Sequence, residues 1–335
     1  MSITARQIHL VSRPDGMPNH DHFATVEVEL PALGNGQVLI KNHYMSVDPY
    51  MRGRMRAQGV YAEPYALNQP MYGGAVGEVL KSNAEGFEVG DTVLNGAAWQ
   101  DNFLTDASSL NKLTPFDENR ISLYLGTLGM PGMTAYVGLL RFGEPKPGET
   151  VFVSAASGAV GANVCQIAKN LGCRVIGSVG SDDKAQWLLD ECSVDEVINY
   201  KTCGDLTEAL TKAAPDGVDV YFENVGGEHL QAALNVMNHF GRIAACGMIA
   251  TYNNSKPAPG ANNLMLIVGK KIRINGFIVF DHNDMRTQFL SDMESWVSAG
   301  KIKTKETIVE GLDNAVDAFL ALFTGDNFGK MIVKL

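Results

Sequence analysis

The sequence lacks a cysteine pattern, an excess of basic residues and any long apolar run. Its five cysteines are dispersed without Cys-x-x-Cys spacing, which is typical of reduced thiols in a cytosolic protein. The formal net charge of −10 argues against a nucleic-acid or membrane-surface partner, because those partners require a basic face. No apolar run is long enough to span a bilayer, and the first residues lack a signal-peptide profile. We therefore expect a cytoplasmic protein with no nucleic-acid and no membrane partner.

A strand–turn–helix pattern stands out between residues 150 and 171. Thr150 to Val153 is a β-branched and aromatic run that predicts a buried strand, and Ala162 to Leu171 carries apolar residues at helical spacing. Between them lies Ala156-x-Gly158-x-x-Gly161, a dinucleotide-binding pattern with alanine in place of its first glycine. Small residues let the backbone approach a pyrophosphate, and the helix N-terminus offers free N–H groups. The stretch predicts a phosphate-binding turn.

The next strand indicates which dinucleotide is bound. Arg174 to Val179 is a second buried-strand run and completes a βαβ unit. An NAD site usually has an acidic residue at the end of this strand, whereas here it ends in Gly180-Ser181 with Lys184 just beyond. A missing carboxylate and a nearby cation favour the 2′-phosphate of NADP. Two observations weigh against this: Asp182 and Asp183 lie close by, and a lone Lys184 is also what an ordinary first helical turn contains.

The rest of the chain indicates two structural parts. At 335 residues and 45% apolar composition it is long enough for two domains. Residues 1 to 120 predict short strands between Gly and Asn turns, as in a compact barrel. After residue 150, strands alternate with helices, including an expected helix from His229 to His239 and a strand from Ile272 to Val279. This alternation predicts a doubly wound parallel sheet. The strands at 307–309 and 330–333 form a tail that we expect to return to the first part.

Five longer motifs are distributed along the chain. They are Ser46-Val-Asp-Pro-Tyr-Met-Arg52, Leu128-Gly-Met-Pro-Gly-Met-Thr-Ala135, Glu223-Asn-Val-Gly-Gly227, Gly247-Met-Ile-Ala-Thr-Tyr-Asn253 and Asn327-Phe-Gly-Lys330. They resemble motifs of the zinc-independent prostaglandin reductase branch of the medium-chain dehydrogenase/reductase superfamily, which includes leukotriene B4 12-hydroxydehydrogenase and the bacterial NADPH-dependent curcumin and alkenal reductases. The similarity covers essentially the whole chain.

The resemblance implies a fold and an activity. The fold is α/β, with a doubly wound parallel Rossmann sheet that binds NADP (126–292) and a β-rich GroES-like barrel domain for substrate (1–125 and 293–335). The activity is NADPH-dependent reduction of the C=C bond of α,β-unsaturated ketones and aldehydes. Enones, alkenals, curcumin and 15-oxo-prostaglandins are the expected substrate types. By analogy, the apolar strand from Ile272 to Val279 also implies a homodimer.

The resemblance also assigns cofactor residues by position. Lys184 and Tyr200, near Gly180, would hold the 2′-phosphate. Ala156 to Val160 would face the pyrophosphate. Met130 and Thr134 would lie near the carboxamide, and four residues would line the nicotinamide and its ribose. The cofactor-binding residues so implied are Met130, Thr134, Ala156, Gly158, Ala159, Val160, Gly180, Lys184, Tyr200, Asn224, Phe277, Val279 and Asn327.

Two tyrosines are the candidate catalytic residues. Reduction of an enone places negative charge on the carbonyl oxygen, and a tyrosine O–H can stabilise it. Tyr252 follows a strand end, where open α/β sheets bind ligands, although a loop tyrosine that packs on the neighbouring domain would have the same position. Tyr61 matches a family tyrosine, but its loop can equally serve packing or gating. Tyr50, Arg52 and Arg54 are expected to be structural, with the arginines available to pair with Asp48.

Zinc ligands are missing from the sequence. Where zinc alcohol dehydrogenases carry a cysteine, this chain has Ser46-Val-Asp48, and no Gly-His-Glu occurs. The seven histidines form no spaced ligand set. We therefore expect no metal. Two alternative functions remain, namely an NADPH quinone reductase of the same superfamily and a non-catalytic NADPH-binding protein. The motifs Thr251-Tyr-Asn253 and Asn327-Phe-Gly-Lys330 favour the enone reductase over the quinone reductase. The nearly intact phosphate-binding turn and the presence of both tyrosines argue against the non-catalytic protein.

Overall fold

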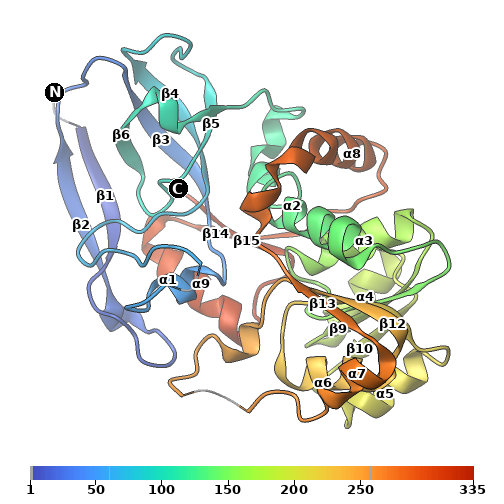
Figure 1. Ribbon diagram of the computed structural model, residues 1–335. Coiled ribbons are helices and arrows are strands. Elements are labelled where there is room, and N and C mark those ends of the chain that lie inside the picture. The colour runs from blue at the N-terminus through green and yellow to red at the C-terminus, as the bar shows by residue number, and fades with distance from the viewer. Residues whose placement is uncertain (1–2, 60, 257–258) are drawn as a thin grey trace.

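A parallel sheet of six strands forms the core of one half of the molecule. The computed structural model describes residues 3–59, 61–256 and 259–335. The strand order is β10-β9-β8-β11-β12-β13, and all five pairings are parallel (Figure 1). The order reverses between β8 and β11, so the predicted doubly wound sheet is confirmed. The strands are β8 (Thr150–Val153), β9 (Arg174–Val179), β10 (Glu196–Asn199), β11 (Val218–Glu223), β12 (Met237–Ala245) and β13 (Arg273–Gly276).

Alternating side chains of the central strands bury both faces of this sheet. Val151 and Val153 belong to one core cluster, whereas Phe152, between them, belongs to another. Strand residues alternate between faces, so a strand apolar at every position requires helices on both sides. The helices of the chain are α1 (Met51–Arg54), α2 (Met130–Val137), α3 (Gly161–Asn170), α4 (Asp182–Asp190), α5 (Leu206–Ala213), α6 (Gly227–Val236), α7 (Met265–Lys270), α8 (Arg286–Ser298) and α9 (Ala315–Thr324).

The other half is a mostly antiparallel barrel sheet with a separate hairpin. Its order is β14-β15-β3-β4-β5-β7, β6 also pairs with β3, and β1 pairs with β2. Register shifts between β3 and β4 bend the sheet. Its strands are β1 (Ile3–Leu10), β2 (Phe23–Leu30), β3 (Gln37–Ser46), β4 (Ala75–Ser82), β5 (Thr92–Asn95), β6 (Asn102–Asp106), β7 (Asn111–Lys112), β14 (Glu306–Glu310) and β15 (Lys330–Lys334).

The C-terminal tail returns to the first half, as expected. Strand β15 pairs antiparallel with β3, with Ile332 opposite Ser46, and α9 lies in the same half (Figure 1). The domain boundaries at 125/126 and 292/293 stay predictions. Helix α8 crosses the second of them, and it packs on α2 through Tyr136, whose ring meets Phe289 and whose hydroxyl donates to Asp292 at 2.5 Å.

Two expected elements have different ends in the structure. The helix expected from His229 to His239 runs from Gly227 to Val236, because residues 237–245 form β12 and pair with β11. The strand expected over 272–279 runs from Arg273 to Gly276, because β12, its partner strand among the described residues, ends at Ala245. Backbone pairing with a neighbouring strand, rather than local apolarity, sets both ends.

Within the described ranges, no single helix is long and apolar enough to cross a bilayer. One pair of helical segments, Glu118–Leu125 and Met130–Gly143, meets the length and composition together but is bent by 55°.

Candidate cofactor crevice and active site

The turn after β8 is built so that backbone atoms approach closely. A Cβ on Gly161 would lie 2.2 Å from the carbonyl oxygen of Ala155, so only glycine fits at the start of α3. Ala156 replaces the usual glycine, and its methyl lies 2.9 Å from where a Cβ on Gly177 of β9 would stand. Gly177, which has no side chain, makes room for the methyl group of Ala156. The turn therefore packs closely on β9 although its first glycine is missing.

The ends of β8 and β11 meet where the strand order reverses. The Asn224 side chain donates to the carbonyl oxygen of Ser154 at 2.7 Å, and its backbone N–H donates to the Ser154 hydroxyl at 2.9 Å. These bonds fix the predicted nicotinamide-side residue Asn224 at the crevice where open α/β sheets bind ligands.

Glu223 is a buried acid that sequence reasoning quoted only as part of a motif. One of its carboxyl oxygens accepts from the backbone N–H groups of Val225 and Gly226, at 2.7 and 2.8 Å, and from the Tyr221 hydroxyl at 2.7 Å. Its side chain is fully buried, and burial raises its pKa. Glu223 therefore shapes the turn that carries Asn224.

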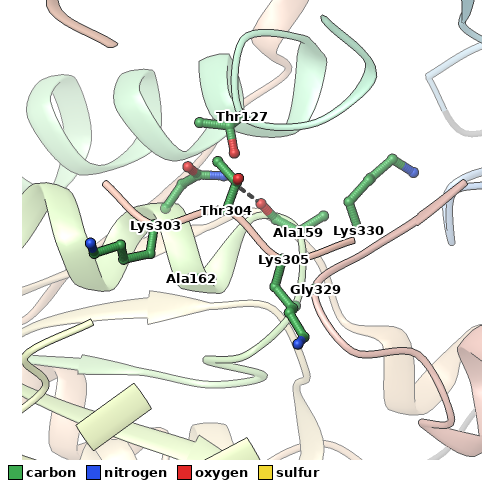
Figure 2. Close-up of a pocket in the computed structure, with 10 residues that line it drawn as sticks. Thr127, Ala159, Ala162, Lys303, Thr304, Lys305, Gly329 and Lys330 are labelled. Carbon is green, nitrogen blue, oxygen red and sulfur yellow. Dashed lines mark hydrogen bonds between the residues drawn. The ribbon is translucent and has the colours of Figure 1, made fainter. Parts of the chain in front are cut away.

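The C-terminal tail crosses the phosphate-binding turn. The N–H of Gly329 donates to the carbonyl oxygen of Ser157 at 3.0 Å, and the Asn327 side chain donates to the carbonyl oxygen of Gly329 at 3.0 Å. Asn327 is thereby held beside the turn, although 166 residues separate it from Gly161 in sequence. A small pocket lies between the tail and the turn, lined among others by Ala159 and Lys305 (Figure 2).

Tyr200, one of the two residues expected at the 2′-phosphate, lies against Gly180. A Cβ on Gly180 would lie 2.9 Å from the Tyr200 hydroxyl and 3.2 Å from the Cε of Lys201. Burial and the nearby charge of Lys201 lower the pKa of Lys184. Sequence reasoning did not predict Lys201, because no local pattern distinguishes it from an exposed lysine. Lys184 also donates to the carbonyl oxygen of Gly325 at 2.6 Å, which ties it to the end of α9.

One of the two acids that weighed against NADP is engaged elsewhere. The Asp182 carboxylate accepts from the side chain of Asn199 at 2.6 Å. An amide partner does not neutralise a carboxylate, and the charge of Asp183 also acts on Lys184, so the two acids still weigh against a phosphate at this place.

The remaining cofactor candidates occupy α2 and the segment after β13. The Thr134 hydroxyl donates to the carbonyl oxygen of Met130 at 2.8 Å, one helical turn earlier. The Phe277 ring stacks on Phe142, with centroids 5.1 Å apart, and Val279 is buried. Packing thus fixes Phe277 and Val279. Helix α2 packs against the segment Val279–Met285, and a Cβ on Gly138, directly after α2, would lie 2.5 Å from the Phe277 ring.

The two candidate catalytic tyrosines lie in one region. The Tyr252 hydroxyl is 2.9 Å from where a Cβ on Gly247 would stand. Burial raises the pKa of Tyr252 to about 12, and the nearby Cys246, Tyr61 and Glu223 add to this. Tyr252 is therefore a neutral O–H donor near pH 7. Tyr61 is 57% exposed, and its position fits a residue at the mouth of a site.

Two arginines of the barrel half hold the loop that carries Tyr252. Arg56 donates to the carbonyl oxygens of Tyr252 and Asn254, at 3.1 and 3.3 Å. Arg52 is only 2% exposed and donates through Nε to the Asn253 side chain at 3.0 Å. Its Nη2 donates to the carbonyl oxygens of Pro14 and Gly16. This loop therefore bridges the two halves.

The expected pairing of Arg52 and Arg54 with Asp48 is wrong. Asp48 accepts from Lys330 at 3.0 Å, in a buried ion pair, and from Ser46. Arg54 instead lies over the rings of Tyr65 and Tyr72, 4.7 and 4.3 Å from their centroids. The sequence could not reveal this, since the cation that pairs with Asp48 lies 282 residues away.

The buried His229 makes the free energy of unfolding depend on pH. Burial lowers its pKa from 6.5 to about 4, so the unfolded chain takes up this proton first as the pH falls. His229 therefore destabilises the fold progressively below pH 6.5, by about 2 kcal/mol at pH 5. We measure the free energy of unfolding by urea titration at pH 7 and at pH 5. We expect it to fall less between these pH values in His229→Phe than in wild type. Equal losses in both proteins would contradict this assignment.

A search of the described ranges finds no group of three or more His, Cys, Asp or Glu residues placed to hold a metal ion. The absence of a zinc site stays a prediction.

Comparison with known proteins identifies the family. Residues 6–113 match the family model described as N-terminal domain of oxidoreductase, and residues 159–295 match the one described as zinc-binding dehydrogenase. The NADP(+)-dependent 2-alkenal reductase of Nicotiana tabacum is 42% identical, covering 99% of this chain and 98% of its own. The NADPH-dependent curcumin reductase of Escherichia coli is 41% identical, covering 97% and 95%.

A solved structure also matches this chain over almost its full length. The structure of CurA from Vibrio vulnificus in complex with NADPH has a TM-score of 0.94 and 42% identity, and the match covers 98% of each chain. Prostaglandin reductase 1 of Bos taurus is 42% identical, covering 95% of this chain and 95% of its own. The motifs, the two-part architecture and these relatives lead to one conclusion: the chain belongs to the prostaglandin reductase branch of the medium-chain dehydrogenase/reductase superfamily.

Proposed function

We propose that this protein reduces the C=C bond of α,β-unsaturated ketones and aldehydes with NADPH. The observation that carries the proposal is the pairing of a cation-lined Gly180 site with a half-buried, neutral Tyr252 in a chain over 40% identical to an alkenal and a curcumin reductase. Enones, alkenals, curcumin and 15-oxo-prostaglandins are the candidate substrates. NADP is the cofactor, and when bound it supplies the hydride for the β-carbon.

The residues present fit this cofactor. The Tyr200 hydroxyl and the Lys201 side chain lie against Gly180, and Lys184 follows in the first turn of α4, so a phenol O–H and two ammonium groups would hold the 2′-phosphate. Residues 156–160 would face the pyrophosphate, with Asn327 beside them. The N–H groups of Ala156 and Gly158 already donate to Ser178 and Ala155, so the donors would come from the other residues of the turn. Asn224, Phe277 and Val279 would line the nicotinamide and its ribose, and Met130 and Thr134 would lie near the carboxamide.

Tyr252 is the proposed catalytic residue. Negative charge develops on the substrate carbonyl oxygen as the β-carbon is reduced, and a positioned O–H donor stabilises it. A pKa of about 12 keeps Tyr252 protonated, so it donates a hydrogen bond throughout the reaction. Tyr61, at the mouth of the site, would assist by a second hydrogen bond or by covering the substrate.

We also propose a cytoplasmic, zinc-independent homodimer. The five cysteines are free thiols. The edge strand β13 exposes Ile274, and the segments on either side expose Met265, Val268 and Phe280. An apolar strand edge of this kind is suited to pairing with a second copy. Light scattering after gel filtration should give about twice the 36.1 kDa chain mass; a single-chain mass would contradict the dimer.

The activity is tested by following NADPH absorbance with a substrate panel. The panel comprises an alkenal, a cyclic and a linear enone, curcumin, a quinone and a saturated ketone, each with NADPH and with NADH. We expect turnover of the unsaturated carbonyls with NADPH and a saturated product. Turnover of the quinone alone would favour a quinone reductase. Tight NADPH binding without any turnover would favour a non-catalytic protein.

Arg56→Ala should lower kcat/KM for an enone without changing the Kd for NADPH. The change removes two hydrogen bonds to the loop that carries Tyr252. Because each is worth about 1 kcal/mol net, we expect kcat/KM for an enone to fall about tenfold. The Kd for NADPH, measured by fluorescence, should stay within about twofold. Arg6→Ala, which breaks an exposed ion pair with Asp313, is the matched control. An unchanged kcat/KM in Arg56→Ala would contradict the loop's role.

A further inference from the structure

A buried serine–histidine pair lies beneath the Gly180 site. The His229 Nε2 and the Ser178 hydroxyl oxygen are 2.8 Å apart, and the two residues are 5% and 0% exposed. Ser178 lies near the end of β9, two residues before Gly180, and His229 lies in the first turn of α6. Burying polar groups in a core costs folding free energy unless the groups are hydrogen-bonded, and this pair provides such a bond. Neither residue has a part in the roles proposed above.

The His229 ring contacts Tyr200. The two rings meet edge to face, with centroids 5.1 Å apart and an interplanar angle of 76°. Tyr200 is 40% exposed, so the protein contacts only part of its surface, and the His229 contact is on the buried side. The Tyr200 hydroxyl in turn lies over Gly180. The orientation of the His229 ring therefore helps to set where the Tyr200 hydroxyl points.

The hydrogen bond to Ser178 fixes that ring. An imidazole without a partner can rotate or tilt, whereas one bonded to a strand residue is held in a single orientation. Ser178 is itself anchored, since its carbonyl oxygen accepts from the N–H of Ala156 at 2.9 Å. The phosphate-binding turn, the pair and Tyr200 thus form one connected unit.

We infer that the Ser178–His229 pair positions Tyr200 and thereby sets the preference of the crevice for a ribose 2′-phosphate over a 2′-hydroxyl. The inference rests on the proposed use of NADPH. Its action is steric and orientational, because the buried imidazole is uncharged near pH 7 and adds no charge of its own toward a phosphate. His229 is a positioning residue, and Tyr200 is the group that contacts the phosphate.

The test compares NADPH and NADH binding by cofactor fluorescence. Ser178→Ala removes one oxygen atom, and His229→Phe keeps the ring but removes the hydrogen bond. We expect each to raise the Kd for NADPH about tenfold and to leave the Kd for NADH within about twofold. In a Tyr200→Phe background, the further change His229→Phe should have little effect on either Kd, because the hydroxyl it positions is gone.

The controls separate positioning from folding. His9→Phe replaces another buried, hydrogen-bonded histidine, in the barrel half, and should leave the NADPH/NADH ratio unchanged. Thermal unfolding checks that each variant is folded. Equal losses for both cofactors, or an unchanged ratio in folded Ser178→Ala and His229→Phe, would overturn the inference alone. A wild-type protein that binds NADH as tightly as NADPH would overturn the proposed cofactor as well.

Discussion

Tyr252→Phe is expected to lower kcat for an enone about 100-fold, the typical cost of removing one hydrogen-bond donor to a developing oxyanion. The variant keeps the ring and loses only the hydroxyl, which lies over Gly247. The Kd for NADPH should not change, because the hydroxyl serves the substrate oxygen and not the cofactor. The readouts are single-turnover NADPH oxidation and a separate fluorescence titration of NADPH.

Two further variants test whether the loss of kcat is specific to the Tyr252 hydroxyl. Tyr124→Phe removes a hydroxyl near Glu294, away from the proposed site, and should leave kcat unchanged. Tyr61→Phe should have a smaller effect than Tyr252→Phe, since Tyr61 is 57% exposed. A Tyr252→Phe enzyme with wild-type kcat would remove Tyr252 from the mechanism. A larger loss in Tyr61→Phe would make Tyr61 the principal donor.

Removing both cations at Gly180 should abolish the preference for NADPH. A charge-assisted hydrogen bond to phosphate contributes about 1.5–3 kcal/mol, so the double change Lys184→Ala and Lys201→Ala should lower kcat/KM for NADPH about 100-fold. The value for NADH should change by about twofold or less. Both are measured from initial rates with one enone at saturating concentration.

The single variants separate binding from stability. Lys184 also donates to Gly325, so Lys184→Ala can lower the melting temperature, whereas the Lys201 side chain donates no hydrogen bond to the described residues. Lys201→Ala therefore tests the phosphate contact cleanly. Lys212→Ala, at the exposed end of α5, is the matched control. Equal NADPH and NADH values in wild type, or an unchanged ratio in the double variant, would contradict the site.

The sequence predicted the parts of the crevice that are contiguous in the chain. The residues from Val151 to Gly161 and from Arg174 to Gly180 identify a phosphate-binding turn by local pattern alone, and the structure confirms both strands and the helix between them. It also explains the one irregular position, because Ala156 packs against Gly177. That compensation involves a second strand, which a local pattern cannot include.

Contacts between residues that are far apart in the chain could not be predicted from the sequence. Arg52 and Asn253 are 201 residues apart, and Lys330 and Asp48 are 282 apart, so no spacing rule connects them. His229 counted only as one of seven histidines without metal spacing, and its pairing with Ser178 required the fold. The ends of α6 and β13 were misplaced because strand pairing sets them.

The most direct test of the proposed activity uses NADPH carrying deuterium on its transferable position, with a linear enone, followed by NMR of the product. The proposal predicts a saturated ketone with deuterium on the β-carbon and a solvent-derived proton on the α-carbon. An allylic alcohol with deuterium on the carbinol carbon, or no labelled product despite NADPH oxidation, would contradict it.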